Sequence, residues 1–161
     1  MALSSKFSVA ECVVRWVLYL LAADFCFYVA HRTLHTPWLY HGHHDGHHEF
    51  KVTPTAKFTM NSLVANCLTP FDMFFEGMLP VMLPSLLISL PFTWLYSYFL
   101  FHGFWFAVIH STGKHCGLVP SLGGIMVTPT AHAIHHNNGI KNCNFAAHLT
   151  LWDRLLGTYE A

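Results

Sequence analysis

Long apolar segments with almost no charge constrain the fold of this chain more than any other feature of its sequence. Between Val13 and Val29 the charged residues are Arg15 and Asp24. A helix of about 20 residues, rising about 1.5 Å per residue, spans the hydrocarbon core of a bilayer. The segment therefore predicts one membrane-crossing helix. A cleaved signal peptide is the disfavoured alternative, because no small-residue cleavage site separates the segment from the histidine motif that follows.

A second apolar interval occupies residues 58–113, where the formal charges are Asp72 and Glu76. It is long enough for two crossings and a turn. Pro91 marks the turn, and Phe92–Ile109 forms the second limb. Prolines interrupt the first limb, so its beginning can instead lie along the membrane interface.

Histidine is the second unusual feature, because its 14 residues outnumber the 8 basic and the 8 acidic residues alike. Three clusters have the spacing that places side chains on one face of a helix. These clusters are His31 and His35, then His44, His47 and His48, and finally His132, His135 and His136. Gly42 and Gly46 weaken a helix in the second cluster, so a register through His41, His43 and His44 stays open. Thr128 and Pro129 predict a helix N-terminus just before the third.

Neutral imidazole binds transition metals, and eight such ligands exceed what one tetrahedral or octahedral ion can bind. The clusters therefore predict a pair of metal ions, with a metal-free histidine-rich surface as the alternative. His110, at the end of the second limb, is a ninth candidate ligand, and His115 is a weaker one. We expect His102 and His148 to be satisfied core residues instead. Spacing alone does not name the ion.

Asp24 and Tyr28 share a helical stripe with His31 and His35, because they precede His31 by seven and three residues. A charge inside a membrane helix rarely faces lipid. We expect Asp24, with Tyr28 beside it, to orient a ligand imidazole by accepting its second N–H. The alternative is a polar contact between helices without metal.

The position of the clusters also predicts a topology. If histidines before Lys57 and after Lys114 build one site, the chain between them crosses the membrane an even number of times. The basic residues then lie mostly on the side of the site, which is expected to be cytosolic. The predicted fold is an all-α integral membrane protein, one domain over residues 1–161. It has about three transmembrane helices and a cytosolic, histidine-rich helical cap holding a dinuclear metal site.

Composition excludes two classes of protein. Only 10% of the residues are charged, whereas about a quarter are charged in a typical soluble domain. A freely soluble enzyme is therefore disfavoured. The formal net charge of zero offers no basic surface for a phosphate backbone, so a nucleic acid partner is not expected.

Four segments, in this order, carry a resemblance to a known family. They are D-F-C-F-Y-V-A-H-R-T-L-H (24–35), H-D-G-H-H-E-F (44–50), H-A-I-H-H (132–136) and T-L-W-D-R-L-L-G-T-Y (150–159). Together with T-P-F-D (69–72) they resemble the fatty acid hydroxylase/sterol desaturase superfamily, closest in look to enzymes of the lathosterol oxidase and sterol methyl oxidase types. Asn144-Phe145-Ala146 departs from the Asn-Tyr-Gly that is common in the family. The chain is expected to be either a compact member or an incomplete gene product.

The resemblance implies a multi-pass enzyme of the endoplasmic reticulum membrane, with its histidine boxes facing the cytosol. Such an enzyme uses a non-haem centre of two iron ions, O₂ and two electrons to hydroxylate or desaturate a membrane lipid, here a sterol by preference. It also assigns the iron ligands in this sequence, which are His31, His35, His44, His47, His48, His110, His132, His135 and His136.

Electrons must come from a partner, because no G-x-G-x-x-G motif follows a strand. The resemblance implies a cytochrome b-type donor with its reductase, and Lys114 and Lys141 are candidates for docking its acidic surface. Three alternative functions stay open. They are a fatty acyl or sphingolipid hydroxylase, a non-enzymatic histidine-rich membrane protein that binds or transports metal, and an inactive paralogue that only binds sterol.

Overall fold

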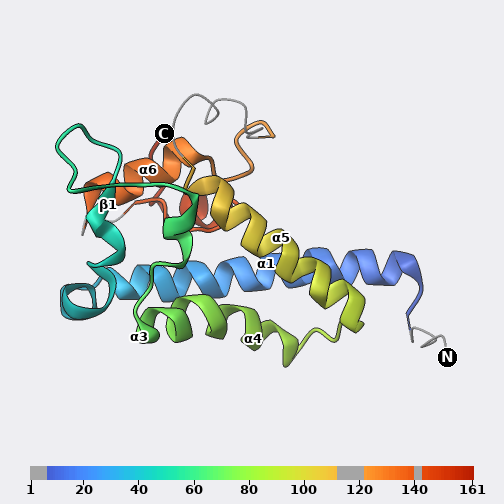
Figure 1. The fold of residues 1–161 in the computed structure, drawn as a ribbon. Coiled ribbons are helices and arrows are strands. Elements are labelled where there is room, and N and C mark those ends of the chain that lie inside the picture. Colours follow the sequence, from blue (N-terminus) through green and yellow to red (C-terminus); the bar gives the residue numbers. More distant parts are fainter. Residues whose placement is uncertain (1–6, 112–121, 140–142) are drawn as a thin grey trace.

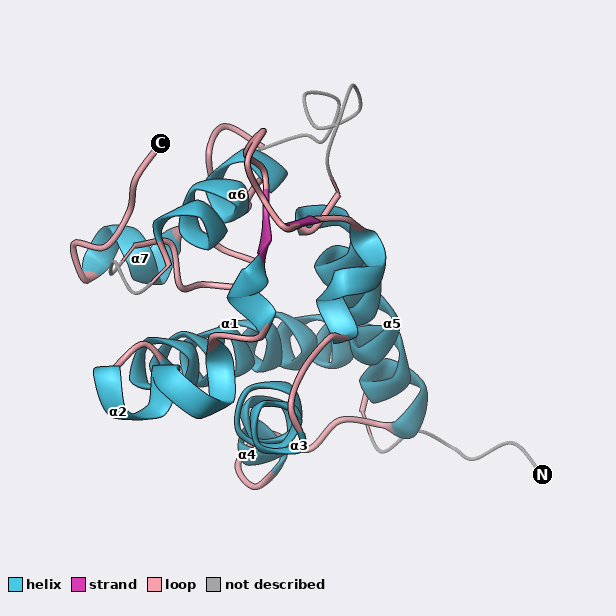
Figure 2. Cartoon of the chain, turned by 60° about the vertical axis from the view of Figure 1, so that its left-hand side comes forward, coloured by secondary structure: helices cyan, strands magenta, loops and turns pink. Residues whose placement is uncertain are grey.

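The computed structural model describes residues 7–111, 122–139 and 143–161, and within them the chain is mostly helical, as predicted (Figure 1). In chain order the helical segments are α1 (Val9–Leu34), α2 (Pro37–Leu39), η1 (Tyr40–His44), η2 (His47–Glu49), η3 (Ser62–Asn66), α3 (Pro70–Asp72), η4 (Met73–Met78), α4 (Leu79–Ser85), α5 (Phe92–Ile109), α6 (Pro129–Asn138) and α7 (Leu151–Leu155). Two short strands, β1 (Phe50–Lys51) and β2 (Phe58–Thr59), pair in parallel (Figure 2).

Helix α1 is 26 residues long and begins at a capping box. The Ser8 hydroxyl accepts a hydrogen bond from the Glu11 amide at 3.3 Å, and the Glu11 carboxylate accepts one from the Ser8 amide at 2.8 Å. These reciprocal bonds satisfy backbone donors that a helix start leaves free. At about 1.5 Å per residue, the helix is about 39 Å long, which exceeds the thickness of a hydrocarbon core.

Among the described residues, α1 and α5 are the two helices long and apolar enough to cross a membrane. Only 33% of the most apolar window of α1 and 17% of that of α5 is buried inside the protein. Val14 on α1 and Phe104 on α5, for example, are 58% and 65% exposed. The core helix of a soluble protein would bury such side chains, so the two helices fit a membrane protein.

The third crossing predicted between these helices is not among the spans found. The helical run through α3, η4 and α4 covers residues 70–85, which is shorter than either long helix, and it contains a π-helical turn at Met73–Met78. Pro84 lies inside its last turn, where proline cannot donate a backbone hydrogen bond, and the helix ends at Ser85.

This run packs along α1 in the opposite direction, while α5 returns towards the C-terminal end of α1 (Figure 1). The Tyr19 hydroxyl donates to the Val81 carbonyl, which joins α1 to α4. The Tyr19 ring meets Tyr98 of α5 edge-on at 4.9 Å between ring centroids. As a result, the C-terminal ends of α1 and α5 lie at the same end of the molecule, which we call its pole.

The segment after α6 is folded around the buried carboxylate of Asp153. This carboxylate accepts hydrogen bonds from the amides of Phe145 and Ala146 at 2.8 and 2.9 Å. The Thr158 hydroxyl donates to it at 2.7 Å, and Gly157 has a φ of 71°, which favours glycine. The residues of the W-D-R-L-L-G-T motif thus shape a loop that presents the backbone near Phe145.

Asp24 attaches the same segment to α1. Its carboxylate accepts hydrogen bonds from the His148 amide at 2.8 Å, the Leu149 amide at 3.1 Å and His148 Nδ1 at 3.0 Å. Asp24 is fully buried. The carboxylate therefore fixes the C-terminal segment against the middle of a membrane-type helix.

We expect Asp24→Asn to destabilise the protein by about 1–3 kcal/mol, because asparagine has one acceptor oxygen and turns an amide towards the remaining donors. Unfolding of the purified protein in detergent micelles measures this difference. Asp45→Asn, at an exposed site, is the matched control and should stay within about 0.5 kcal/mol of wild type. Equal stability of Asp24→Asn and wild type would contradict the anchoring role.

Candidate metal centre

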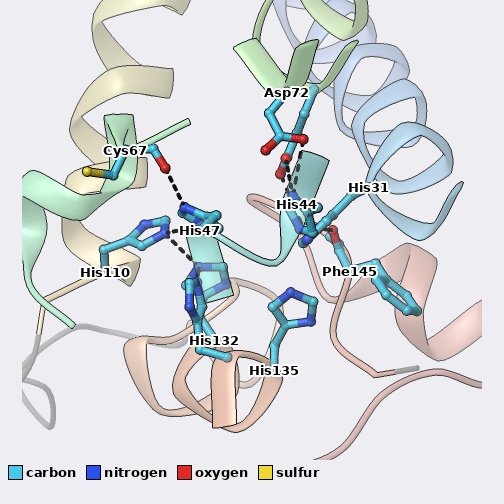
Figure 3. Close-up of polar contacts among 12 residues, drawn as sticks. His31, His44, His47, Cys67, Asp72, His110, His132, His135 and Phe145 are labelled. Atoms are coloured by element: carbon cyan, nitrogen blue, oxygen red, sulfur yellow. Dashed lines mark hydrogen bonds and ion pairs between the residues drawn. The ribbon is translucent and has the colours of Figure 1, made fainter. Parts of the chain in front are cut away.

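The nine histidines predicted as ligands are all buried, and the structure brings them together in two groups. Within each group the ligand atoms lie within 4.8 Å of one another. The five-histidine group contains His31, His35, His44, His48 and His135. The four-histidine group contains His47, His110, His132 and His136. Figure 3 shows His47, His110 and His132 on one side of the centre and His31, His44 and His135 on the other.

The histidines of the first and third clusters lie in the terminal turns of helices or next to them. His31 lies in the last turn of α1, His35 caps its C-terminus, and His110 caps the C-terminus of α5. The third cluster lies on α6, whose predicted start is confirmed, because the Thr128 hydroxyl accepts from the Ala131 amide at 3.2 Å and Pro129 is the first helical residue. Side chains at helix ends can meet across the pole where α1 and α5 terminate.

The second cluster is not a single α-helix, contrary to the expectation of one helical face. His44 ends the π-helical segment η1, and His47 and His48 lie in the separate 3-10 turn η2. Gly42, with a φ of 114°, also interrupts the helical backbone just before His43 and His44. Even so, the three imidazoles point inward.

The alternative register of this cluster does not assemble. The His41 side chain is 69% exposed and lies near Asp45. The His43 ring stacks on Phe71, with 4.2 Å between ring centroids. His44 is therefore the one member of that register that belongs to a group.

Backbone carbonyls orient two of the imidazoles in the five-histidine group. His31 Nδ1 lies 2.8 Å from the Phe145 carbonyl oxygen, and His135 Nδ1 lies 2.7 Å from that of Cys143. A carbonyl can only accept, so in both rings Nδ1 carries the proton and Nε2 carries a lone pair. Within the described residues none of the five Nε2 atoms has a hydrogen-bond partner. Buried polar atoms left in this way indicate a missing ligand.

The four-histidine group is built in the same manner. Nδ1 of His110 and of His136 donate to the carbonyls of Phe106 and Phe50 at 2.8 and 3.0 Å, and His47 Nδ1 faces that of Cys67 at 3.4 Å.

The Nε2 atoms of this group converge. Those of His110 and His132 are 3.0 Å apart, those of His132 and His136 are 3.2 Å apart, and those of His47 and His110 are 3.3 Å apart. Nitrogen ligands about 2.1 Å from one divalent ion stand about 3.0 to 3.4 Å apart. Facing lone pairs repel one another unless a cation lies between them, so the residues fit a bound metal ion.

Burial keeps most of these imidazoles neutral and able to bind metal. Burial lowers the pKa of His110 to about 4 and that of His135 to about 3. Burial, and after it repulsion between neighbouring imidazoles, also lowers the pKa of His35, His47, His48, His132 and His136.

His44 is the exception. Burial lowers its pKa, but the carboxylates of Glu76 and Asp72 outweigh this effect, so that the pKa is raised overall. His44 Nδ1 lies 3.4 Å from Asp72 Oδ1 and 3.6 Å from Glu76 Oε2.

Asp72 and Glu76 do not belong to the metal site predicted from the sequence. A signal for this acidic pair was present, because Asp72 and Glu76 are the formal charges of the apolar interval 58–113. An intramembrane or buried charge marks a functional site by default. Spacing could not connect the pair to His44, because the contact depends on how α3 and η4 pack.

Asp24 does not orient any of the nine histidines. Its carboxylate binds His148, whose Nε2 in turn contacts His102 Nδ1 at 3.2 Å. The Tyr28 hydroxyl accepts a hydrogen bond from the Arg32 guanidinium at 2.8 Å and shares one with the Thr158 hydroxyl at 3.1 Å. The hydrogen bonds of both side chains are thus made with residues other than the nine histidines. His148 is buried and His102 is half-buried, and each makes a hydrogen bond, which fits the expectation of satisfied residues. His115, Lys114 and Lys141 lie outside the described residues.

Comparisons with known proteins give a consistent result. A sequence model described as fatty acid hydroxylase matches residues 16–158. The Delta(7)-sterol 5(6)-desaturases of Candida glabrata and Saccharomyces cerevisiae are each 30% identical to the chain, over 149 and 157 residues. The corresponding enzyme of Candida albicans is 33% identical over 143 residues.

These alignments cover 92%, 94% and 88% of this chain but 36%, 38% and 33% of the three relatives. The chain thus spans little more than a third of the length of the curated relatives that it matches. No solved structure matches the chain significantly.

We expect purified protein to bind two transition-metal ions per chain, because two groups of lone pairs converge. His136→Ala and His35→Ala should each remove one ion, since they truncate different groups. Elemental analysis by mass spectrometry against protein concentration measures the stoichiometry. The exposed His41→Ala is the control and should retain both ions; one ion in wild type would contradict the assignment of two groups.

Acidification should destabilise the metal-free protein. An imidazole whose pKa is lowered by folding binds a proton in the unfolded chain first, so stability is lost as pH falls below about 6.5. His44, with a raised pKa, acts in the opposite direction but is outnumbered. Thermal unfolding of the metal-free protein between about pH 7 and about pH 5 should show a falling midpoint. A constant or rising midpoint would indicate that the imidazoles are not buried as neutral groups.

Proposed function

The chain belongs to the fatty acid hydroxylase family, and we propose from this premise that it is a membrane oxidoreductase acting on a lipid. It would use O₂ and two electrons to hydroxylate or desaturate an unactivated C–H position. A sterol is the favoured substrate, because the relatives named above are sterol desaturases. The observation that carries the proposal is the pair of buried histidine groups with converging Nε2 atoms.

Two iron ions are the proposed cofactor, one held by each histidine group. Iron bound there would supply the one-electron chemistry that O₂ activation requires. The protein contributes fixed ligands, because backbone carbonyls hold Nδ1 of His31, His135, His110 and His136. Such outer partners set the tautomer and the ring orientation of a metal-binding histidine.

Exclusion of water is the second contribution of the chain. All nine ligand side chains are 5% exposed or less. The Phe145 ring packs edge-on against His31 at 5.6 Å and His135 at 5.7 Å between ring centroids. A dry site protects a reactive oxidant from side reactions. The apolar outer faces of α1 and α5 leave a lipid substrate free to approach from the bilayer.

The proposed topology has three passes in one domain. Both α1 and α5 end at the histidine groups, so the chain between them must return across the membrane. The run through α3, η4 and α4, which lies antiparallel to α1, supports a third pass over residues 70–91 (Figure 1). We place the histidine groups in the cytosol, because basic residues gather on that side. We place the protein in the endoplasmic reticulum, because the family resemblance implies that membrane.

An external carrier would deliver the electrons. We propose a cytochrome b-type donor with its reductase, because no dinucleotide-binding motif is visible in the sequence. The metal-transport alternative is less well supported, since a transport path requires ligands within the spans. In the described residues, the two histidine groups lie at helix ends, and His102 is the histidine in the middle of α5.

Replacement of one ligand tests the function. His135→Ala should abolish O₂-dependent conversion of Delta(7)-sterols while the protein remains membrane-inserted, because His135 Nε2 points into the five-histidine group. Mass spectrometry of lipids from membranes supplied with a reduced donor measures the product, with fatty acyl lipids tested in parallel. His41→Ala should keep wild-type turnover. Retained turnover in His135→Ala would overturn the proposal.

A further inference from the structure

Two of the buried carboxylates in the described residues have oxygens without a hydrogen-bond partner. Four carboxylates are buried there, those of Asp24, Asp72, Glu76 and Asp153. Asp24 and Asp153 each accept three hydrogen bonds from amides and side chains. Asp72 and Glu76, by contrast, are 0% and 5% exposed, and both Asp72 oxygens and Glu76 Oε2 have no hydrogen-bond partner within the described residues.

The pair faces the five-histidine group. Asp72 Oδ1 and Glu76 Oε2 lie 3.4 and 3.6 Å from His44 Nδ1, which leaves His44 Nε2 directed at the other histidines. Figure 3 shows Asp72 beside His44. This is the arrangement in which a carboxylate orients a metal-binding imidazole through its second nitrogen.

Glu76 reaches further into the group than Asp72 does. Its Oε1 lies 3.8 Å from His31 Nε2, the nitrogen whose lone pair points into the group. Neighbouring ligands of one ion, each about 2.1 Å from it, are about 3.0 to 3.4 Å apart. At 3.8 Å the Glu76 oxygen lies slightly beyond this range, so a small movement of its side chain would bring it into contact with the ion.

The backbone conformation around Glu76 also supports a place for this residue in the site. Glu76 lies in the π-helical turn η4 between α3 and α4. Such turns are rare and are found frequently at functional sites. The turn changes the direction of side chains along the helical run and points Glu76 towards α1.

Charge supplies the physical reason. Imidazoles bring no negative charge to the site, so divalent ions among them would be buried positive charges. A buried charge is strongly unfavourable unless an opposite charge is close. Asp72 and Glu76 are the buried carboxylates of the described residues that contact a histidine group.

We propose that Glu76 is a further metal-contacting residue of the five-histidine group, and that Asp72 acts as a positioning residue that holds His44. This inference rests on the proposed function in one respect, namely that the group binds a divalent metal ion. The pair would neutralise part of the charge of that ion and strengthen its binding.

The test compares Glu76→Gln with wild type and uses Glu49→Gln, at an exposed site, as the matched control. Fe²⁺ alone is titrated into the purified, metal-free protein under anaerobic conditions with a competing chelator. Glu76→Gln should weaken the binding of one of the two ions by about 10- to 100-fold, the range found when supporting groups of a metal site are removed. Glu49→Gln should bind both ions as wild type does. Equal affinities in Glu76→Gln and wild type would overturn the proposal.

Thermal unfolding separates metal contact from packing. In the metal-free protein, Glu76→Gln should be as stable as wild type or more stable, because it removes a buried carboxylate without a full partner. In the iron-loaded protein the same variant should be less stable than wild type. An equal loss of stability in both states would indicate a packing role and overturn the proposal. Wild-type protein that binds iron but converts no lipid would overturn the proposed function and leave this inference standing.

Discussion

The hydrogen bond from an imidazole Nδ1 to a backbone carbonyl is the interaction on which the centre depends. His31, His110, His135 and His136 each make it with a carbonyl that belongs to another turn or segment. Because the carbonyl can only accept, every such ring presents an Nε2 lone pair on its opposite edge. The lone pairs then converge in two buried groups. A metal-binding geometry thus follows from the backbone that surrounds the histidines as much as from the histidines themselves.

The Phe145 carbonyl is in place because buried carboxylates hold the segment that carries it. Asp153 gathers the amides beside Phe145, and Asp24 ties the next residues to α1. The Phe145 carbonyl can therefore meet His31 across more than a hundred residues of sequence. A second pair of carboxylates, Asp72 and Glu76, lies on the other side of the five-histidine group. The buried acids thus divide between shaping the loop and balancing the charge of the site.

The helices place this centre at one pole. Helices α1 and α5 both end there, and the run through η4 and α4 brings the chain back beside α1 (Figure 1). Their outward faces remain apolar, whereas the pole gathers the imidazoles and the acids. Such a separation of surfaces suits a site at the boundary between a bilayer and water, which a lipid can approach from its apolar side.

The sequence by itself determined the two long apolar helices and the three histidine clusters, because hydropathy and the spacing of histidines along the chain are local properties. Only the tertiary structure decided how the clusters divide. It assigned His47 to one group and His48 to the other, although they are adjacent in the chain, because the 3-10 turn points them in different directions. It also paired the Asp24 carboxylate with His148, which is not one of the nine histidines, and placed the Glu76 carboxylate near His31 and His44. Those contacts join segments that are distant in sequence, and packing between helices rather than spacing along one of them creates such contacts.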